Sequence, residues 1–168
     1  MEIRLAQKSD LSKINKLFTE VIKDLKVNKK IDMLWGEVYP FCEFDSDILN
    51  ENMYVLEKNN EIIGSFSLSD YDDPDYKNIK WTSGDKNFFY INRLVVLPSE
   101  QGKGYAKEMM QFIDEYARRN KFDVIRLTVY CENVFAIGLY DKLGFKKVNE
   151  GNWKLDGKVF IGYEKNIK

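Results

Sequence analysis

Histidine is absent from this chain of 168 residues, and its absence excludes several classes of enzyme at once. Without an imidazole, no Ser–His or Cys–His pair can activate a nucleophile, and most catalytic zinc sites lose their usual ligand. Proton transfer is left to carboxylates, tyrosine, cysteine, lysine or water. A reaction in which the substrate supplies its own nucleophile, such as an amine that attacks a thioester, is compatible with these proton-transfer groups.

Cysteine is scarce as well. The two cysteines, Cys42 and Cys131, lie far apart in the sequence and form no Cys-x-x-Cys pattern. This spacing indicates neither a zinc site nor a disulfide framework, so we expect no bound metal. We expect both thiols to occupy buried or half-buried positions.

Long apolar runs and an excess of one charge are also missing. No apolar segment approaches the roughly 18 residues of a membrane-spanning helix, and the first residues, Met-Glu-Ile-Arg, lack the order of a signal peptide. A net charge of −1 provides no overall attraction to nucleic acid or to anionic lipid. We therefore expect a cytoplasmic protein without nucleic-acid or membrane partners, built as a single domain over residues 1–168.

What the chain does contain is a glycine-rich turn, Gln101-Gly-Lys-Gly104-Tyr-Ala106. It follows an apolar strand expected at 88–97 and opens a helix expected at 104–120. Glycines let backbone N–H groups turn towards a ligand, and the helix presents its unpaired N-terminal donors at the same point. The turn therefore predicts a site for a phosphate or a pyrophosphate.

Two better-known phosphate loops do not fit this turn. The chain has no Gly-x-x-x-x-Gly-Lys-Ser/Thr sequence, so a nucleotide-triphosphatase loop is unsupported. The dinucleotide fingerprint fails because Lys107 stands where close packing of helix on strand requires a small residue.

A second pattern follows the strand expected at 124–130. It reads Asn133-x-x-Ala136-Ile137-x-x-Tyr140 and is ended by Gly144-Phe145. The first four of these residues lie at i, i+3, i+4 and i+7, so they share one face of a short helix. The glycine marks the end of that helix.

Together, the two patterns resemble the GNAT superfamily of acyl-CoA-dependent N-acyltransferases. Gln101-x-x-Gly104-x-Ala106 fits the pyrophosphate loop of that family, and the pattern from Asn133 to Phe145 fits its second motif. The match covers about 90–145. The resemblance implies acetyl-CoA as cosubstrate, without a metal.

The same resemblance assigns roles to individual residues. Leu94 and Val96, with Val95 between them, would offer main-chain contacts to the pantetheine arm, and Tyr140 would be the general acid that protonates the departing thiolate. Asn133 would contact the cofactor or cap its helix, and these alternatives stay open. The full set of residues assigned to the cofactor is Leu94, Val95, Val96, Gln101, Gly102, Lys103, Gly104, Tyr105, Ala106, Asn133 and Tyr140.

The general base and the acceptor are less well defined. Many relatives carry a glutamate on the strand before the loop, but this chain has Asn92 there. The proton of the amine could pass through ordered water to backbone carbonyls or to a remote acid such as Glu43, Glu57 or Asp70. The other interpretation of each of these acids is an ordinary surface carboxylate. Acceptor choice is expected in two irregular segments, 28–44 and 70–86. Their aromatic residues could line a pocket or serve the core, and the aspartates at 70–75 could attract a cationic amine or be solvated.

The other expected elements follow from local signals. We expect a strand at 2–7 and then a helix capped by Ser9 or Asp10, with an apolar stripe of Leu11, Ile14, Leu17, Phe18, Val21 and Leu25. A short second helix is expected at 45–50, and Asn59-Asn60 would join strands at 53–58 and 61–68 in a tight hairpin. Strands expected at 146–153 and 158–164 would form a terminal hairpin.

The order of expected elements predicts an α/β fold with a mixed, mostly antiparallel sheet and helices on both faces. The resemblance implies that its central pair of parallel strands splays apart. The predicted function is transfer of an acetyl group from acetyl-CoA to a primary amine of a small molecule or a peptide, by direct attack in a ternary complex. The alternatives are a catalytically weak acyl-CoA-binding sensor or an interaction domain on the same fold. The oligomeric state stays open, a homodimer being one option.

Overall fold

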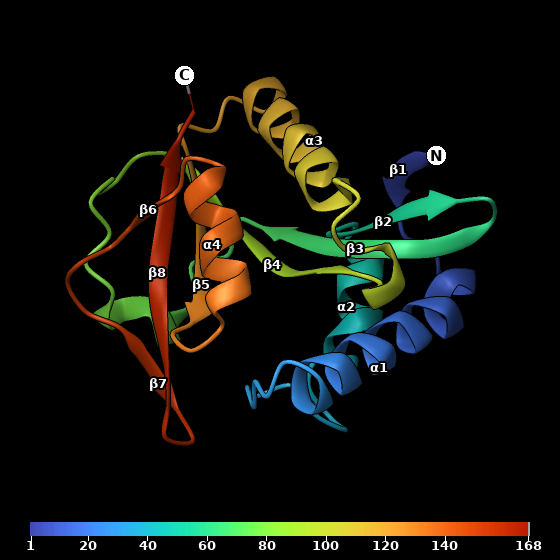
Figure 1. The fold of residues 1–168 in the computed structure, drawn as a ribbon. Helices are drawn as coiled ribbons and strands as arrows, with labels where there is room; N and C mark the ends of the chain where they lie inside the picture. The colour runs from blue at the N-terminus through green and yellow to red at the C-terminus, as the bar shows by residue number, and fades with distance from the viewer. Residues whose placement is uncertain (168) are drawn as a thin grey trace. The chain divides into compact units, whose positions relative to one another are not determined.

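The computed structural model describes residues 1–167, which form two compact units (Figure 1). The first unit contains Met1–Leu68 and Asn92–Phe112, and the second contains Ser69–Ile91 and the chain from Ile113 onward. Strand β4 (Phe88–Val96) and helix α3 (Tyr105–Arg119) each contribute to both units, because a unit boundary falls inside them.

The first unit is built on an antiparallel meander. Strand β1 (Glu2–Leu5) pairs with β2 (Met53–Lys58), which pairs with β3 (Glu61–Ser69). The turn between β2 and β3 places Asn59 and Asn60 at φ of 52° and 64°, which confirms the expected tight hairpin.

Two helices complete this unit. Helix α1 (Leu11–Val27) follows a single 3₁₀ turn at Lys8–Asp10, and its predicted apolar stripe is confirmed. The buried members of that stripe are Ile14, Leu17, Phe18, Val21 and Leu25. Helix α2 (Phe44–Leu49) matches the short second helix expected nearby.

The second unit contains the parallel pair of strands. The first residues of β4 pair in parallel with β5 (Val124–Tyr130), from Phe88 opposite Val124 to Tyr90 opposite Arg126. Strand β5 also pairs antiparallel with β8 (Lys158–Asn166) along its length. Helix α4 (Val134–Lys142) follows β5.

The C-terminal part differs from the predicted hairpin. Instead of one strand over 146–153, β6 (Lys146–Lys147) and β7 (Trp153–Leu155) pair separately with β8. The polar stretch 149–152 contains Gly151 at φ 80° and interrupts the ladder. The strand order β1-β2-β3-β4-β5-β8-β6, with β7 also on β8, confirms a mixed, mostly antiparallel α/β sheet.

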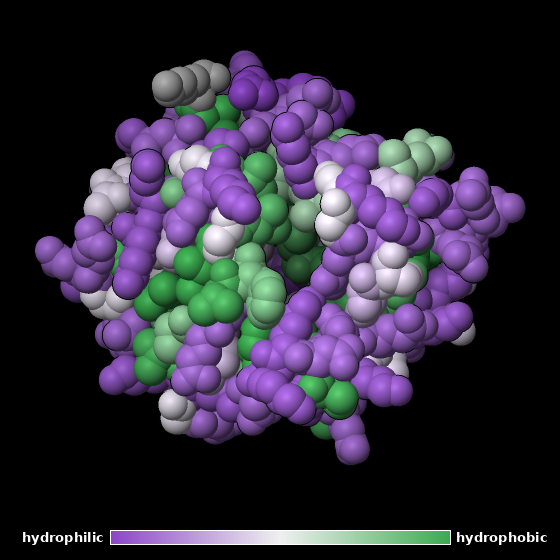
Figure 2. All heavy atoms as spheres, in the orientation of Figure 1, coloured by the Kyte–Doolittle hydropathy of each residue, from purple (hydrophilic) through white to green (hydrophobic). Residues whose placement is uncertain are grey.

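Both cysteines are exposed, so the expectation that they are buried or half-buried was wrong. Cys42 lies in the 3₁₀ turn Phe41–Glu43, and Cys131 directly follows β5. On the face drawn in Figure 2, apolar side chains gather over helix α4, where Val134 and Phe135 are exposed. Within residues 1–167, no helix is long and apolar enough to cross a membrane, and no group of three His, Cys, Asp or Glu side chains could hold a metal ion.

Candidate functional site

The turn between β4 and α3 has the backbone conformation of an anion site. Gly102 and Gly104 lie at φ of 78° and 92°, in the left-handed region. A Cβ atom added at either position would meet no atom within 4 Å. Glycine is therefore suited to these positions by backbone conformation rather than by packing, and a β-branched residue would be strained.

The turn also leaves a row of main-chain donors without acceptors. Helix α3 begins at Tyr105, and its first helical bond runs from the N–H of Glu108 to the carbonyl of Gly104, at 3.1 Å. Among the described residues, none accepts a hydrogen bond from the N–H groups of Gly102 to Ala106. Unpaired donors at the positive end of a helix dipole favour an anion there.

The side chain of Gln101 makes two hydrogen bonds that connect this turn to neighbouring segments. Its Nε2 donates to the carbonyl oxygen of Val96 at 3.0 Å, and its Oε1 accepts from Lys29 Nζ at 2.7 Å. Lys29 also forms an ion pair with Asp24 at 2.8 Å. The Gln101 amide thus holds the turn on the end of β4, and sequence reasoning missed Lys29 because it is remote in the chain.

Lysines near the turn share a carboxylate. Glu100 forms ion pairs with Lys58 and with Lys103, both at 3.1 Å. Hydrogen bonds from these two lysines lower the pKa of Glu100. The charge of Lys103 is thus partly compensated, whereas the main-chain N–H groups of the turn have no acceptor among the described residues.

The strand before the turn carries an irregularity. Arg93 lies at φ 53°, a left-handed conformation that is uncommon for a residue with a side chain. Its guanidinium forms an ion pair with Asp47 of α2, and Ser67 donates a hydrogen bond to the same carboxylate at 2.8 Å. Leu94, Val95 and Val96, the residues predicted to face the cofactor, follow directly on β4.

Helix α4 is closed at both ends by the residues of the second motif. Asn133 Oδ1 accepts from the N–H of Ala136 at 3.1 Å, so the side chain caps the helix. At the other end, Gly144 adopts φ 85°. The N–H of Phe145 donates to the carbonyl of Tyr140 at 3.1 Å, and the N–H of Gly144 donates to the carbonyl of Asp141. This is a Schellman motif, and its hydrophobic contact joins the rings of Phe145 and Tyr140, with centroids 5.5 Å apart.

Tyr140, the predicted acid, is buried, and burial raises the pKa of its phenol to about 12. Its hydroxyl makes no hydrogen bond to the residues that the structure describes. A phenol with this pKa is protonated at neutral pH, which is the state that a proton donor requires.

The carboxylates considered as bases differ in their surroundings. Glu57 forms an ion pair with Arg4 at 2.6 Å, and Glu43 accepts from the thiol of Cys42 at 3.5 Å. Asp72, one of the aspartates at 70–75 that could attract a cationic amine or be solvated, accepts a hydrogen bond from the Tyr90 hydroxyl at 3.0 Å. Nothing in the local sequence marks that contact, because 18 residues separate its partners.

The predicted site residues fall into two groups. The first unit brings Leu94, Val95 and Val96 together with the turn from Gln101 to Ala106. The second unit brings Asn133 and Tyr140 together on α4.

A strand, a left-handed glycine turn and a helix with unpaired N–H groups form an arrangement that suits a phosphate-bearing ligand. Residues 19–145 match the Acetyltransferase (GNAT) family, and the chain belongs to this family. It is 25% identical over 153 residues to the L-methionine sulfoximine/L-methionine sulfone acetyltransferase of Salmonella typhimurium, an alignment over 86% of this chain and 80% of that protein. It is 29% identical over 65 residues to the uncharacterized N-acetyltransferase YobR of Bacillus subtilis, over 39% of this chain and 26% of that protein.

Solved structures share the fold over nearly the whole chain. A GNAT family acetyltransferase from Streptococcus agalactiae has a TM-score of 0.85 at 23% identity, covering 99% of this chain and 95% of the other. A Salmonella typhimurium protein solved with its cofactor acetyl-CoA has a TM-score of 0.69 at 18% identity, covering 100% of this chain and 94% of the other.

Proposed function

We propose that this protein transfers an acetyl group from acetyl-CoA to a primary amine of a small molecule or peptide, with residues 1–168 acting as one GNAT-like domain. The observation that carries the proposal is the row of N–H groups from Gly102 to Ala106 without acceptors among the described residues. These groups would bind the pyrophosphate of the cofactor. A phosphate-bearing cosubstrate agrees with the family, and a structural relative was solved with acetyl-CoA.

In the proposed reaction, the amine attacks the thioester directly. A nitrogen–carbon bond forms, the carbon–sulfur bond breaks, and the thiolate of CoA receives a proton from the Tyr140 hydroxyl. The attacking nitrogen releases one proton to water, and the tyrosinate takes one proton back from water, so that the step balances. Thiols have pKa values near 8.5, so the leaving group needs only modest assistance. The Leu94–Val96 main chain and Asn133 would add contacts to the cofactor, and no metal takes part.

The acceptor is proposed at the level of its functional group. The Salmonella relative acetylates L-methionine sulfoximine and L-methionine sulfone, so small amino acids and their analogues belong in the first set of acceptors to test. Polyamines, aminoglycosides and peptides with a free N-terminus complete the set. CoA release from acetyl-CoA, followed by a thiol reagent, measures turnover with each acceptor.

Gly104→Val tests the cofactor site. A valine at φ 92° is strained and distorts the N–H row, so we expect acetyl-CoA affinity to fall at least tenfold in calorimetry. Gly138→Ala, on helix α4, is a matched glycine control because an added Cβ there meets no atom within 4 Å. Unchanged acetyl-CoA affinity in Gly104→Val would remove the turn from the proposal.

A second function is favoured by one observation: Asn92 stands on β4 where many relatives carry a carboxylate. An acyl-CoA-binding sensor with weak turnover would bind acetyl-CoA as tightly as an enzyme does. It would release CoA only slowly, whichever acceptor is added. Calorimetry together with the release assay therefore separates the two functions.

A further inference from the structure

We propose that the buried ion pair of Arg93 and Asp47 positions the main chain of β4 for the cofactor. The pair holds residue 93 in a left-handed conformation, and that conformation sets the direction of the main chain at Leu94–Val96. The inference rests on the proposed function, because these three residues are the ones proposed to contact the pantetheine arm of acetyl-CoA. It concerns the first unit alone.

The first argument is the conformation of Arg93 inside a strand. Its φ of 53° lies in the left-handed region, which is unfavourable for a residue with a side chain. The other described non-glycine residues at positive φ lie outside strands and helices, at Lys30, Glu51, Asn59, Asn60, Lys121 and Asp156. Turns often use this conformation, whereas a strand is extended. An outlier of this kind persists only where surrounding contacts enforce it, and such outliers cluster at ligand sites.

The contacts that enforce this conformation come from α2 and β3. The guanidinium of Arg93 forms an ion pair with Asp47, and Ser67 Oγ donates to the same carboxylate at 2.8 Å. The side chains of Arg93 and Asp47 are only 10% and 12% exposed. Burial lowers the pKa of Arg93, but the charge of Asp47 and an interaction with Tyr39 outweigh this effect and raise it. The guanidinium therefore stays charged, and its ion pair fixes residue 93 on α2.

The second argument is that this arrangement is unfavourable for stability. Both charges of a buried ion pair lose their hydration, and apolar residues of similar size are often at least as stable in its place. In addition, Arg93 Nε is buried and has no acceptor among the described residues. A left-handed backbone, an unpaired nitrogen and a buried charge thus coincide at one residue. Their coincidence indicates a role other than stability.

The third argument is the place of Arg93 along β4. The parallel register with β5 runs only to Tyr90, and the proposed cofactor residues Leu94–Val96 follow Arg93 directly. Just beyond them, the N–H of Leu97 donates to the carbonyl of Ile63 at 2.8 Å, so this segment is also fixed at its far end. Strand irregularities next to active sites commonly redirect the residues that follow them. A change of conformation at residue 93 would therefore reach the main chain of all three cofactor residues.

Tyr39 connects the same pair to a segment expected to select the acceptor. It lies in the first of the two irregular segments and interacts with the guanidinium of Arg93. The N–H of Gly36 donates to the carbonyl of Tyr39 at 2.7 Å, so Trp35 directly precedes a closed turn that contains Tyr39. The indole of Trp35 can therefore report on changes at Arg93.

Acetyl-CoA binding to variants of residue 93 tests the inference. In Arg93→Ala the ion pair is lost and alanine disfavours the left-handed conformation, so we expect acetyl-CoA affinity in calorimetry to fall about five- to tenfold. Arg93→Gly loses the same pair but accepts the conformation, so its affinity should be about threefold higher than that of Arg93→Ala. Arg93→Lys keeps a cation for Asp47 and should also bind acetyl-CoA more tightly than Arg93→Ala does.

The rate of acetyl transfer provides a second readout. At saturating acetyl-CoA, the single-turnover rate of Arg93→Ala should also fall, because a displaced thioester is poorly oriented for attack. A role in stability alone would change neither the affinity nor this rate of the folded protein.

Arg4→Ala is the matched control in the first unit. Arg4 on β1 forms ion pairs with Asp10 at 2.7 Å and with Glu57 at 2.6 Å, and β2 and β3 separate β1 from β4 in the sheet. This variant also loses a partly buried ion pair, so its stability should fall. Its acetyl-CoA affinity and single-turnover rate should stay within about twofold of the original values, because its site is distant from the cofactor residues.

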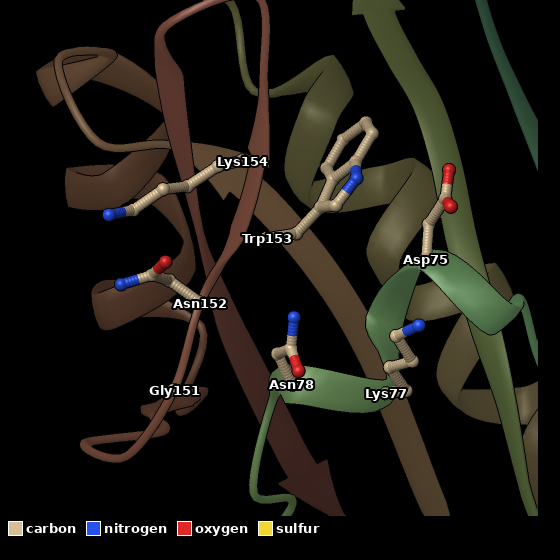
Figure 3. Close-up of a pocket in the computed structure, with 7 residues that line it drawn as sticks. All are labelled: Asp75, Lys77, Asn78, Gly151, Asn152, Trp153 and Lys154. Atoms are coloured by element: carbon tan, nitrogen blue, oxygen red, sulfur yellow. The ribbon is translucent and has the colours of Figure 1, made fainter.

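The indole N–H signals in a ¹H–¹⁵N spectrum show whether the change in Arg93→Ala is local. We expect the signal of Trp35 to shift and the signal of Trp153 to stay in place. Trp153 belongs to the second unit, where its indole and the side chain of Asn78 line a hollow (Figure 3). If both signals shift, the alanine variant is disturbed as a whole, and Arg93→Gly and Arg93→Lys are compared with the original protein instead.

The inference is overturned if the variants of Arg93 bind acetyl-CoA as tightly as the original protein does and react as fast. It is also overturned if the alanine and glycine variants bind equally, or if Arg4→Ala loses as much affinity as Arg93→Ala. Failure of the proposed function looks different. If acetyl-CoA binds but no acceptor is acetylated, the proposed function fails while the affinity comparison still decides the inference. If the original protein binds no acetyl-CoA, both fail.

Discussion

Gln101 Nε2 donates a hydrogen bond to the carbonyl oxygen of Val96 over 3.0 Å and ties the glycine turn to the end of strand β4. In Gln101→Ala this bond is lost, and the turn is free to sample other conformations. One net hydrogen bond contributes about 1 kcal/mol, so we expect acetyl-CoA to bind roughly fivefold more weakly.

Calorimetry with acetyl-CoA measures this effect, and Lys29→Gln is its companion. That variant removes the cation from Gln101 Oε1 but keeps the bond to Val96, so it should weaken binding less than Gln101→Ala does. Equal affinity of Gln101→Ala and the original protein would show that the amide does not organise the turn.

Tyr140→Phe separates the chemical role of the phenol from its packing. The phenylalanine ring keeps the contact with Phe145 that closes helix α4, so thermal stability should change by less than about 2 °C. The rate of the acetyl-transfer step should fall roughly 10- to 100-fold, at the low end for general acids because a thiolate is a good leaving group. Single-turnover kinetics measure this step.

Tyr140→Ala is the structural comparison, since it also removes the ring and should lower both stability and rate. The pH profile adds a second check. Burial raises the pKa of Tyr140 to about 12, so its protonated form persists and the acid contributes no loss of rate between about pH 7 and pH 9. A Tyr140→Phe enzyme with full single-turnover rate would exclude the acid role.

The sequence was most informative where function and local backbone chemistry coincide. The turn at Gln101 to Ala106 and the helix from Asn133 were predictable because glycines, caps and strand boundaries are local signals. The capping role of Asn133, one of two alternatives, could be assigned only from its hydrogen bond to Ala136. Strands β2 and β5 were likewise bounded correctly.

The features that could not be predicted depend on contacts between residues that are distant in the sequence. The pairing of Arg93 with Asp47 and of Tyr90 with Asp72 spans 46 and 18 positions, and no local pattern specifies it. The exposure of Cys42 and Cys131 follows from their places in a 3₁₀ turn and in the turn after β5, which apolar periodicity does not predict. For this reason the surroundings of the proposed acceptor segments were less predictable than the glycine turn proposed for the cofactor.

Arg93 offers a test of how the irregularity in β4 is maintained. Arg93→Ala leaves Asp47 buried without its cation and keeps a side chain at φ 53°, so unfolding should be easier by about 3 kcal/mol. Arg93→Gly loses the same ion pair but accepts the left-handed conformation. It should be about 1 kcal/mol more stable than Arg93→Ala.

Urea unfolding at neutral pH measures both variants. Asp47→Ala combined with Arg93→Ala completes a double-mutant cycle, and the pair should cost less than the sum of the single changes because no unpaired charge remains. Equal stability of the glycine and alanine variants would show that the backbone conformation at 93 carries no strain.

Asp10 makes the stability of the first unit depend on pH. Its carboxylate accepts hydrogen bonds from Arg4, at 2.7 Å and 3.0 Å, and from the N–H of Gln7. The bonds from Arg4 are the main reason that the pKa of Asp10 is lowered in the folded protein. A lowered folded pKa means that the stabilisation is complete above the unfolded value, about 3.9, and is lost as the pH falls through the folded value.

At pH 7 we therefore expect Asp10→Asn to unfold at a lower urea concentration than the original protein, with a free energy of unfolding lower by about 1–2 kcal/mol. Below about pH 3 the free energies of unfolding of the two proteins should become similar. Asn60→Asp is unsuitable as a control because Asn60 lies in a left-handed turn, where a substitution can itself change stability. Glu20→Gln changes an exposed residue of helix α1 and serves as the control. Its free energy of unfolding should follow that of the original protein at every pH. Urea midpoints measured from pH 7 down to pH 2 test this. A stability difference between Asp10→Asn and the original protein that stays constant over that range would show that ionisation of Asp10 does not contribute.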